Sequence, residues 1–197
     1  MRSLTISVVL ILLGLILLGA GCNNYNAMVE LDEETENEWS KVQTAYQRRA
    51  DLIPNLVNTV KGVANFEQET LTSIVEARAK ATSITVDPTN VTPEQLQAFE
   101  QAQAGISQSL GRLLMISENY PELKASAAFV ELQTQLEGTE NRIKVARDRY
   151  NDIVTQYNKK VRRFPGSIFA GIFGFQQKAQ FQAAEAAQNA PTVDFGK

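Results

Sequence analysis

The stretch ASAAFVELQTQLEGTENRIKVARDRYNDIVTQYNKKVRR, residues 125–163, decides the predicted fold of this chain. Its large apolar side chains recur mostly at spacings of three, four and seven: Phe129, Leu132, Leu136, Ile143, Tyr150, Ile153, Tyr157, Val161 and, just beyond, Phe164. Such spacings place side chains on one face of an α-helix. A helix of about 40 residues is about 60 Å long, so the pattern predicts a rod.

The segment before this helix continues the same period. Between residues 28 and 81, apolar residues recur every three or four positions, which predicts a long first helix. Pro54 interrupts it, and a proline removes one helical hydrogen bond and crowds the preceding turn. We therefore expect a kink near Ala50–Pro54, or a break into two helices there. Residues 82–88 are polar and β-branched and are typical of a loop.

A further helix is predicted from Thr92 to about Asn119. The sequence Thr92-Pro93-Glu94-Gln95 combines an N-cap threonine, a proline at the first helical position and a glutamine at the capping-box position. Tyr120-Pro121 ends this helix, because a residue before proline is disfavoured in the α conformation. Together these segments predict an all-α fold, an elongated antiparallel bundle of three to four long helices.

The C-terminal part changes character after Phe164. Residues 166–175 are apolar with frequent glycine, which fits packing against the end of the bundle or, alternatively, contact with a lipid interface. Residues 176–189 are rich in Ala and Gln and are predicted to form a short helix, followed by an extended tail to residue 197. We therefore divide the chain into an N-terminal segment 1–22, a bundle 23–175 and a C-terminal part 176–197.

The N-terminal segment has the composition of an export signal. Arg2 precedes an apolar run from Leu4 to Leu18, and Gly19-Ala20-Gly21 lead to Cys22, the single cysteine of the chain. A cysteine after small residues is the acceptor pattern of bacterial lipoproteins, which predicts cleavage before Cys22 and its lipidation. The alternative is an uncleaved transmembrane helix. Both interpretations place the bundle on the extracytoplasmic side of the membrane, in the bacterial cell envelope, with the inner or outer membrane undecided.

Composition excludes several classes of function. The formal net charge of −3 gives no reason to expect nucleic-acid binding. One cysteine permits no intramolecular disulfide, and the absence of histidine removes the commonest metal ligand and general base. We therefore expect no metal and no cofactor.

Five charged residues lie on or beside the apolar stripes: Arg49, Glu67, Arg78, Glu140 and Arg147. We interpret them as a structural ion-pair network between helices. Removing one partner of a buried pair costs about 3–5 kcal/mol, so alanine substitutions should destabilise the domain. The alternative is a glycan hydrolase that uses Glu67 and Glu140, which requires two carboxylates about 5–10 Å apart beside an open cleft.

Two tyrosine-asparagine pairs, Tyr150-Asn151 and Tyr157-Asn158, are seven residues apart. Both tyrosines therefore share one helix face and both asparagines a neighbouring face. We expect buried tyrosines with asparagines hydrogen-bonded across helices; the alternative is a stripe that binds a peptide or a glycan.

Several motifs, in this order along the chain, resemble the LemA family. They are Tyr25-Asn26, Trp39, the run Arg48–Val57, Val60-Lys61-Gly62, Phe66-Glu67, Glu76-Ala77-Arg78, Tyr120–Lys124, Phe129–Leu132, Glu140, Ala146–Asn151, Tyr157-Asn158 and Arg163-Phe164-Pro165. The resemblance implies a long antiparallel helical bundle held at a membrane by its N-terminal segment, with no established enzymatic activity. A lipoprotein cysteine departs from the usual family member, which keeps a transmembrane helix.

These observations predict a non-enzymatic, membrane-anchored scaffold or interaction module of the cell envelope. Its expected partners are the lipid bilayer and other envelope proteins, and a homo-oligomer is left open. The competing hypothesis is an envelope glycan-binding protein or glycan hydrolase.

Overall fold

The computed structural model describes residues 2–62 and 66–182; for residues 2–11, 13–18 and 20 it describes the backbone alone. Within these ranges the chain forms six helices and no strand, which confirms the predicted all-α class. The elements are α1 (Arg2–Lys61), α2 (Gln68–Ser83), α3 (Pro93–Ser117), α4 (Pro121–Lys124), α5 (Ala127–Arg162) and α6 (Gly166–Phe173).

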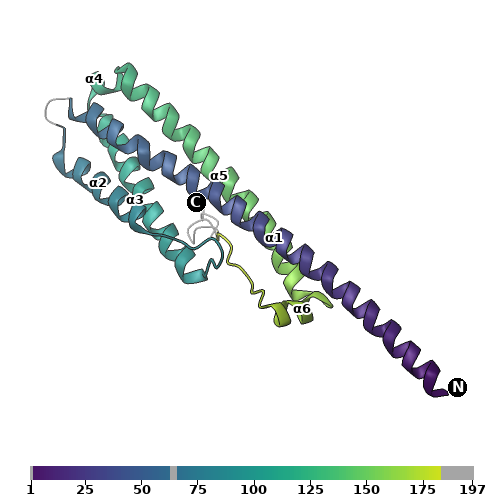
Figure 1. The fold of residues 1–197 in the computed structure, drawn as a ribbon. Helices are drawn as coiled ribbons and strands as arrows, with labels where there is room; N and C mark the ends of the chain where they lie inside the picture. Colours follow the sequence, from purple (N-terminus) through teal and green to yellow (C-terminus); the bar gives the residue numbers. More distant parts are fainter. Residues whose placement is uncertain (1, 63–65, 183–197) are drawn as a thin grey trace, which may run out of the picture.

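The long helices form an elongated antiparallel bundle (Figure 1). Helices α1 and α5 form the most extensive contact of any helix pair, and the α2–α3 hairpin packs on the half of this pair remote from the N-terminus. Short α4 joins α3 to α5 at the remote end. Helix α6 folds back on α1 at the opposite end, and α1 continues beyond it toward the N-terminus (Figure 1).

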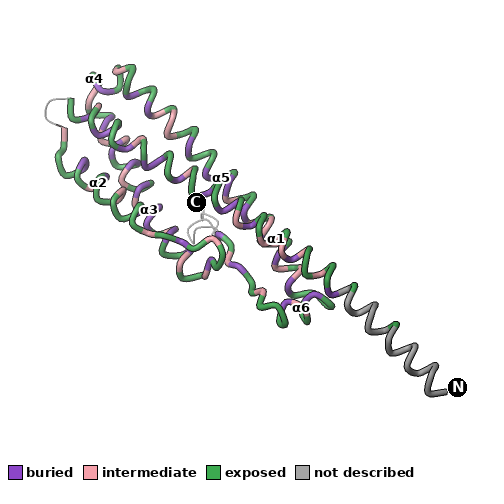
Figure 2. Tube along the Cα trace, viewed as in Figure 1, coloured by how far each residue is buried: buried purple, intermediate pink, exposed green. Residues whose placement is uncertain are grey.

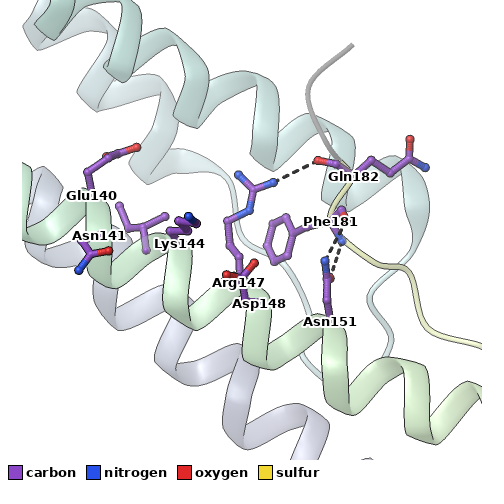
Figure 3. A pocket seen from close by; sticks show the side chains of 9 residues that line it. Glu140, Asn141, Lys144, Arg147, Asp148, Asn151, Phe181 and Gln182 are labelled. Carbon is purple, nitrogen blue, oxygen red and sulfur yellow. Dashed lines mark hydrogen bonds between the residues drawn. The ribbon is translucent and has the colours of Figure 1, made fainter. Parts of the chain in front are cut away.

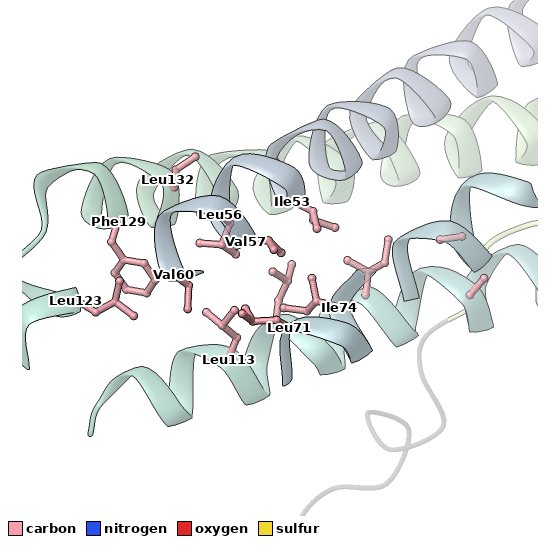
Figure 4. Close-up of a cluster of buried hydrophobic side chains, with 14 residues drawn as sticks. Ile53, Leu56, Val57, Val60, Leu71, Ile74, Leu113, Leu123, Phe129 and Leu132 are labelled. Atoms are coloured by element: carbon pink, nitrogen blue, oxygen red, sulfur yellow. The ribbon is translucent and has the colours of Figure 1, made fainter. Parts of the chain in front are cut away.

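Buried residues follow the inner faces of the helices and form three clusters along the rod (Figure 2). The distal core joins α1, α2, α3 and α5 through residues such as Leu56, Ile74, Leu113 and Phe129 (Figure 4). The middle core centres on Trp39, and the proximal core comprises Met28, Tyr157, Val161 and Ala170. Only the distal core is covered by four helices.

Helices α3 and α5 lie close to where the sequence predicts them. The predicted capping box is present: the Thr92 side chain accepts a hydrogen bond from the Gln95 backbone N–H, and the Gln95 side chain accepts one from the Thr92 N–H. Tyr120 separates α3 from α4, as expected of a residue before proline. The capping box and the spacing of apolar residues therefore locate these two helices.

The prediction of a break at Pro54 is wrong. Pro54 lies inside α1, which continues to Lys61, and the next helix, α2, begins at Gln68. A proline at position 54 leaves the carbonyl of Ala50 without its usual helical donor. The Nε atom of Arg78, on α2, donates to this carbonyl at 2.8 Å. A neighbouring helix thus supplies the missing donor, and α1 runs through the proline.

The predicted helix over residues 176–189 is also wrong in its described part. Residues 176–182 are extended and lie along α5, and residues 183–197 are outside the described range. Residues 166–175 do pack against the end of the bundle as α6, where Gly166 approaches the Lys160 carbonyl so closely that a Cβ atom would overlap it.

The predicted signal or anchor segment, residues 1–22, falls largely outside the described side chains. Among the residues that were described, no helix carries an apolar stretch sufficient to cross a membrane. Cys22 is exposed on α1. Its lipidation, and the division of the chain at residue 22, stay predictions.

The role of Arg78 can be tested by a double-mutant cycle with Pro54. We expect Arg78→Met to lower the free energy of unfolding by about 1–3 kcal/mol, because it leaves the Ala50 carbonyl without a donor. In a Pro54→Ala background the backbone N–H of residue 54 serves that carbonyl, so the same substitution should cost at least about 1 kcal/mol less. Urea midpoints of the four proteins measure the coupling. Equal costs in both backgrounds would contradict this account of α1.

Candidate functional site

Arg49 forms a buried polar junction between three helices. Its side chain on α1 is 2% exposed. One terminal nitrogen, Nη1, donates to Ser107 Oγ at 2.9 Å and to Glu140 Oε2 at 3.0 Å, and Nη2 donates to the backbone carbonyl and side-chain oxygen of Gln103 at 3.1 and 2.7 Å. The guanidinium group also lies over the Tyr46 ring. Arg49 therefore ties α1 to both α3 and α5.

Of the other predicted network residues, Arg147 reaches the junction through a hydrogen bond to the Tyr46 hydroxyl, and Arg78 and Glu67 make contacts of their own. Arg78 binds the Ala50 carbonyl, Glu67 accepts a hydrogen bond from Thr70 at 3.2 Å, and Arg147 pairs with Glu100 at 2.6 Å. Of the five residues, the structure pairs only Arg49 with Glu140. Arg78 links α2 to α1 and Arg147 links α5 to α3, whereas the contact of Glu67 is local to the start of α2.

Glu67 and Glu140 are not brought together. Glu140 lies beside Arg49. Helix α1 ends at Lys61, twelve residues and about 18 Å along the axis from Arg49, and Glu67 comes after that end. An open groove of ≈ 510 Å³ beside α5 includes Glu140 but not Glu67 (Figure 3). Its other lining residues are Asn141, Ile143, Lys144, Arg147, Asp148, Asn151, Phe181 and Gln182. Within the described chain, no group of three or more acidic or cysteine side chains is placed to hold a metal.

The two asparagines of the tyrosine-asparagine pairs bind the extended C-terminal segment. Asn158 donates to the Lys178 carbonyl at 2.9 Å and accepts from the Lys178 N–H at 3.0 Å. Asn151 makes the same two bonds with Phe181, at 3.0 and 2.9 Å (Figure 3). Each asparagine thus satisfies both backbone groups of one residue. We call Asn151, Asn158 and Tyr150 the asparagine clamp and residues 177–182 the C-terminal strap.

Two strap side chains are buried beside the clamp. The Phe181 ring lies 5.8 Å from the Trp39 ring and 5.5 Å from the Tyr150 ring, and the Arg147 guanidinium covers it at 4.4 Å. Lys178 Nζ lies 2.5 Å from Asp32 Oδ1; the two form an ion pair whose angles are not those of a hydrogen bond. The strap therefore covers the middle core with the Phe181 ring, and its paired cation lies over Tyr157 of the proximal core.

A family model for the LemA family matches residues 38–195. The chain belongs to the LemA family. This confirms the resemblance inferred from the motifs, which include Arg49, Glu140 and both tyrosine-asparagine pairs. Arg49 and Glu140 of the junction and the three clamp residues are therefore among those that carry the likeness to LemA proteins.

The individual relatives share about a third or less of their aligned residues with this chain. The chain is 31% identical over 160 residues to Protein LemA of Metamycoplasma hominis, a match that covers 81% of this chain and 69% of that protein. It is 27% identical over 175 residues to Magnetosome protein MamQ 2 of Paramagnetospirillum magneticum and 26% identical over 174 residues to Magnetosome protein MamQ of Magnetospirillum gryphiswaldense. Each of these two matches covers 80% of this chain but only 64% of the relative, less than two thirds of its length.

Burial raises the pKa of several groups around the clamp and so favours their protonated forms. It raises the pKa of the Tyr150 and Tyr157 hydroxyls, and the Asp32 carboxylate adds to this effect at Tyr157. Tyr150 therefore remains a donor and binds the Ala179 carbonyl at 3.1 Å. Burial also raises the pKa of Glu100, although the paired Arg147 opposes the shift.

Sequence reasoning missed the strap and its partners Asp32 and Trp39. The asparagine spacing was the available signal, since it marked a face that needs polar partners. The spacing did not show that those partners are backbone groups of Lys178 and Phe181, because this segment was predicted to be helical. Lys178 and Phe181 themselves lie three apart in a polar segment and have no distinguishing motif.

The structure revises the predicted cost of removing Glu140. We expect Arg49→Ala to destabilise this LemA protein by about 3–5 kcal/mol, because it strands buried polar groups and opens a cavity. Glu140→Ala should cost only about 0–1 kcal/mol, because the Glu140 side chain is 58% exposed and Arg49 keeps its bonds to Ser107 and Gln103. Urea unfolding followed by circular dichroism compares the two variants. Similar urea midpoints for Arg49→Ala and Glu140→Ala would contradict this predicted difference in stability.

Proposed function

We propose that this LemA protein is a non-enzymatic scaffold of the cell envelope, anchored to the membrane at the N-terminal end of its rod. The rod then holds the clamp and the α2–α3 hairpin away from the bilayer. One observation carries the proposal, an exposed apolar surface at that end of the molecule.

The apolar surface is formed where α6 meets α1. Its side chains are exposed by 40 to 81%: Tyr25, Phe164, Ile168, Ile172 and Phe173. Tyr25 and Phe173 are in contact at 4.8 Å between ring centroids, and Phe169 packs on Gly21. We call these five residues the apolar corner. Exposed apolar side chains gathered in one place mark a surface that contacts another apolar phase.

Basic residues adjoin the apolar corner. Helix α5 ends with Lys159, Lys160 and Arg162, and Arg163 follows before α6 begins. Basic side chains next to exposed apolar ones are the combination that binds the interface of an anionic bilayer. The sequence-based alternative of lipid contact by residues 166–175 is therefore favoured, together with packing on α1.

The position of Cys22 supports the same orientation. Cys22 is exposed and lies on α1 between Gly21, which contacts Phe169, and Tyr25, which contacts Phe173. A diacylglycerol on its thiol would leave the protein at the apolar corner. An uncleaved N-terminal helix would enter the bilayer at the same end, and the mass of the N-terminal peptide distinguishes the two anchors.

The hydrolase alternative has weaker support. Glu140 is held by Arg49, and Glu67 does not line the groove beside Glu140. The second carboxylate of the groove, Asp148, is eight residues from Glu140 on α5, a rise of about 12 Å, whereas a catalytic pair requires about 5–10 Å. The arrangement favours a binding and spacing role over glycan hydrolysis.

Quenching by brominated lipids tests the proposed orientation. The chain has a single tryptophan, so Trp39→Phe provides a silent background. In this background we expect Ile172→Trp to lose most of its fluorescence in vesicles of brominated anionic lipid, because position 172 lies in the apolar corner. Val130→Trp, at an exposed position on the remote part of α5, is the matched control and should be unaffected. Equal quenching at both positions would refute the orientation.

A further inference from the structure

The asparagine clamp has the geometry of a peptide-binding site. Asn151 and Asn158 are seven residues apart on α5, a rise of about 10.5 Å. The residues that they bind, Lys178 and Phe181, are three apart in an extended chain, which spans about 10 Å. The two repeats match, so one helix face can bind an extended chain in a fixed register.

The clamp reads the main chain, and two side-chain sites add selectivity. Its hydrogen bonds go to the backbone of Lys178, Ala179 and Phe181 and so impose no side-chain identity. Selectivity comes from the aromatic site beside Trp39 and from the carboxylate of Asp32. The matching ligand is an extended peptide with a cation and, three residues later, an aromatic ring.

The strap is attached to the bundle as a separate arm. Helix α6 ends at Gly174, whose φ of 80° turns the chain in the left-handed region, and Gln176 and Gln177 are exposed. Phe175 is held by its N–H to the Ala170 carbonyl and by its ring beside Tyr25, so a rotation at the exposed Gln176 or Gln177 would carry the strap away without disturbing α5 or α6.

We propose that the clamp also accepts the strap of a second copy of this chain. The strap satisfies every group of the clamp. Exchange between copies breaks and remakes the same contacts, so local concentration determines its extent. This concentration is high for copies held on one membrane, and to that extent the proposal rests on the proposed function. Exchanged straps would link neighbouring rods.

Complementary variants of the full chain in detergent test the exchange without requiring a membrane. One variant, Asn151→Ala with Asn158→Ala, keeps its strap but lacks the clamp. The other, Lys178→Ala with Phe181→Ala, keeps its clamp but lacks a binding strap. We expect differently tagged copies of the two variants to co-purify when mixed, whereas two tagged copies of either variant alone do not. Failure of the mixed pair to associate, with both variants helical by circular dichroism, would overturn the proposal.

A synthetic peptide provides an independent measurement if a double variant does not fold. A fluorescent peptide with residues 175–182 should bind the full-length Phe181→Ala protein saturably and shift the emission of Trp39, which lies beside the vacated ring site. The affinity of the same peptide with alanine in place of Phe181 should be lower by about tenfold, because this peptide lacks the aromatic contacts. Absence of binding by the unmodified peptide would overturn the proposal. Neither result depends on membrane anchoring.

Discussion

The structure depends on a difference in length between its helices. The buried stripe shared by α1 and α5 runs along the whole of α5, which has 36 residues, whereas α2 and α3 have 16 and 25. At 1.5 Å per residue, the hairpin is about 15 Å or more too short to cover the pair. Trp39 and Tyr150 lie at the end of the hairpin, where Phe99 of α3 covers one side of Trp39, and Tyr157 belongs to the proximal core, which includes no hairpin residue. Helix α6 and the strap cover this part of the stripe.

Covering a helix pair with extended chain raises a problem of hydrogen bonding. Backbone N–H and C=O groups placed against a helix find no backbone partners there, because the helix has already used its own. The asparagines at positions 151 and 158 supply a donor and an acceptor each and replace the missing strand. Arg78 solves a similar problem at Pro54, where it serves a carbonyl that the helix cannot. Side chains from neighbouring elements thus permit both irregularities.

Local signals in the sequence were sufficient for the helices but not for these exceptions. The spacing of apolar residues located α5, and the Thr92 capping box located the start of α3. The end of α1 could not be predicted, because it depends on a donor that lies 28 residues further along the chain in α2. The strap resembled a helix in composition, and long-range bonds to α5 hold it extended. For the site, the sequence identified Arg49, its partner Glu140 and the asparagines, but not Gln103, Ser107 or the backbone groups of the strap. The missed groups are side chains of α3 and backbone groups of the strap, which lie far from Arg49 and the asparagines in the sequence.

Amide hydrogen exchange resolved by residue tests most directly whether the clamp holds the strap through its backbone. The N–H groups of Lys178 and Phe181 are bonded to Asn158 and Asn151, whereas the Gln180 side chain, rather than its backbone, makes the contacts of that residue with α5. We therefore expect slow exchange at positions 178 and 181 and fast exchange at Gln180, and Asn158→Ala should speed exchange at position 178 more than at 181. Uniformly fast exchange from 177 to 182 would contradict the account.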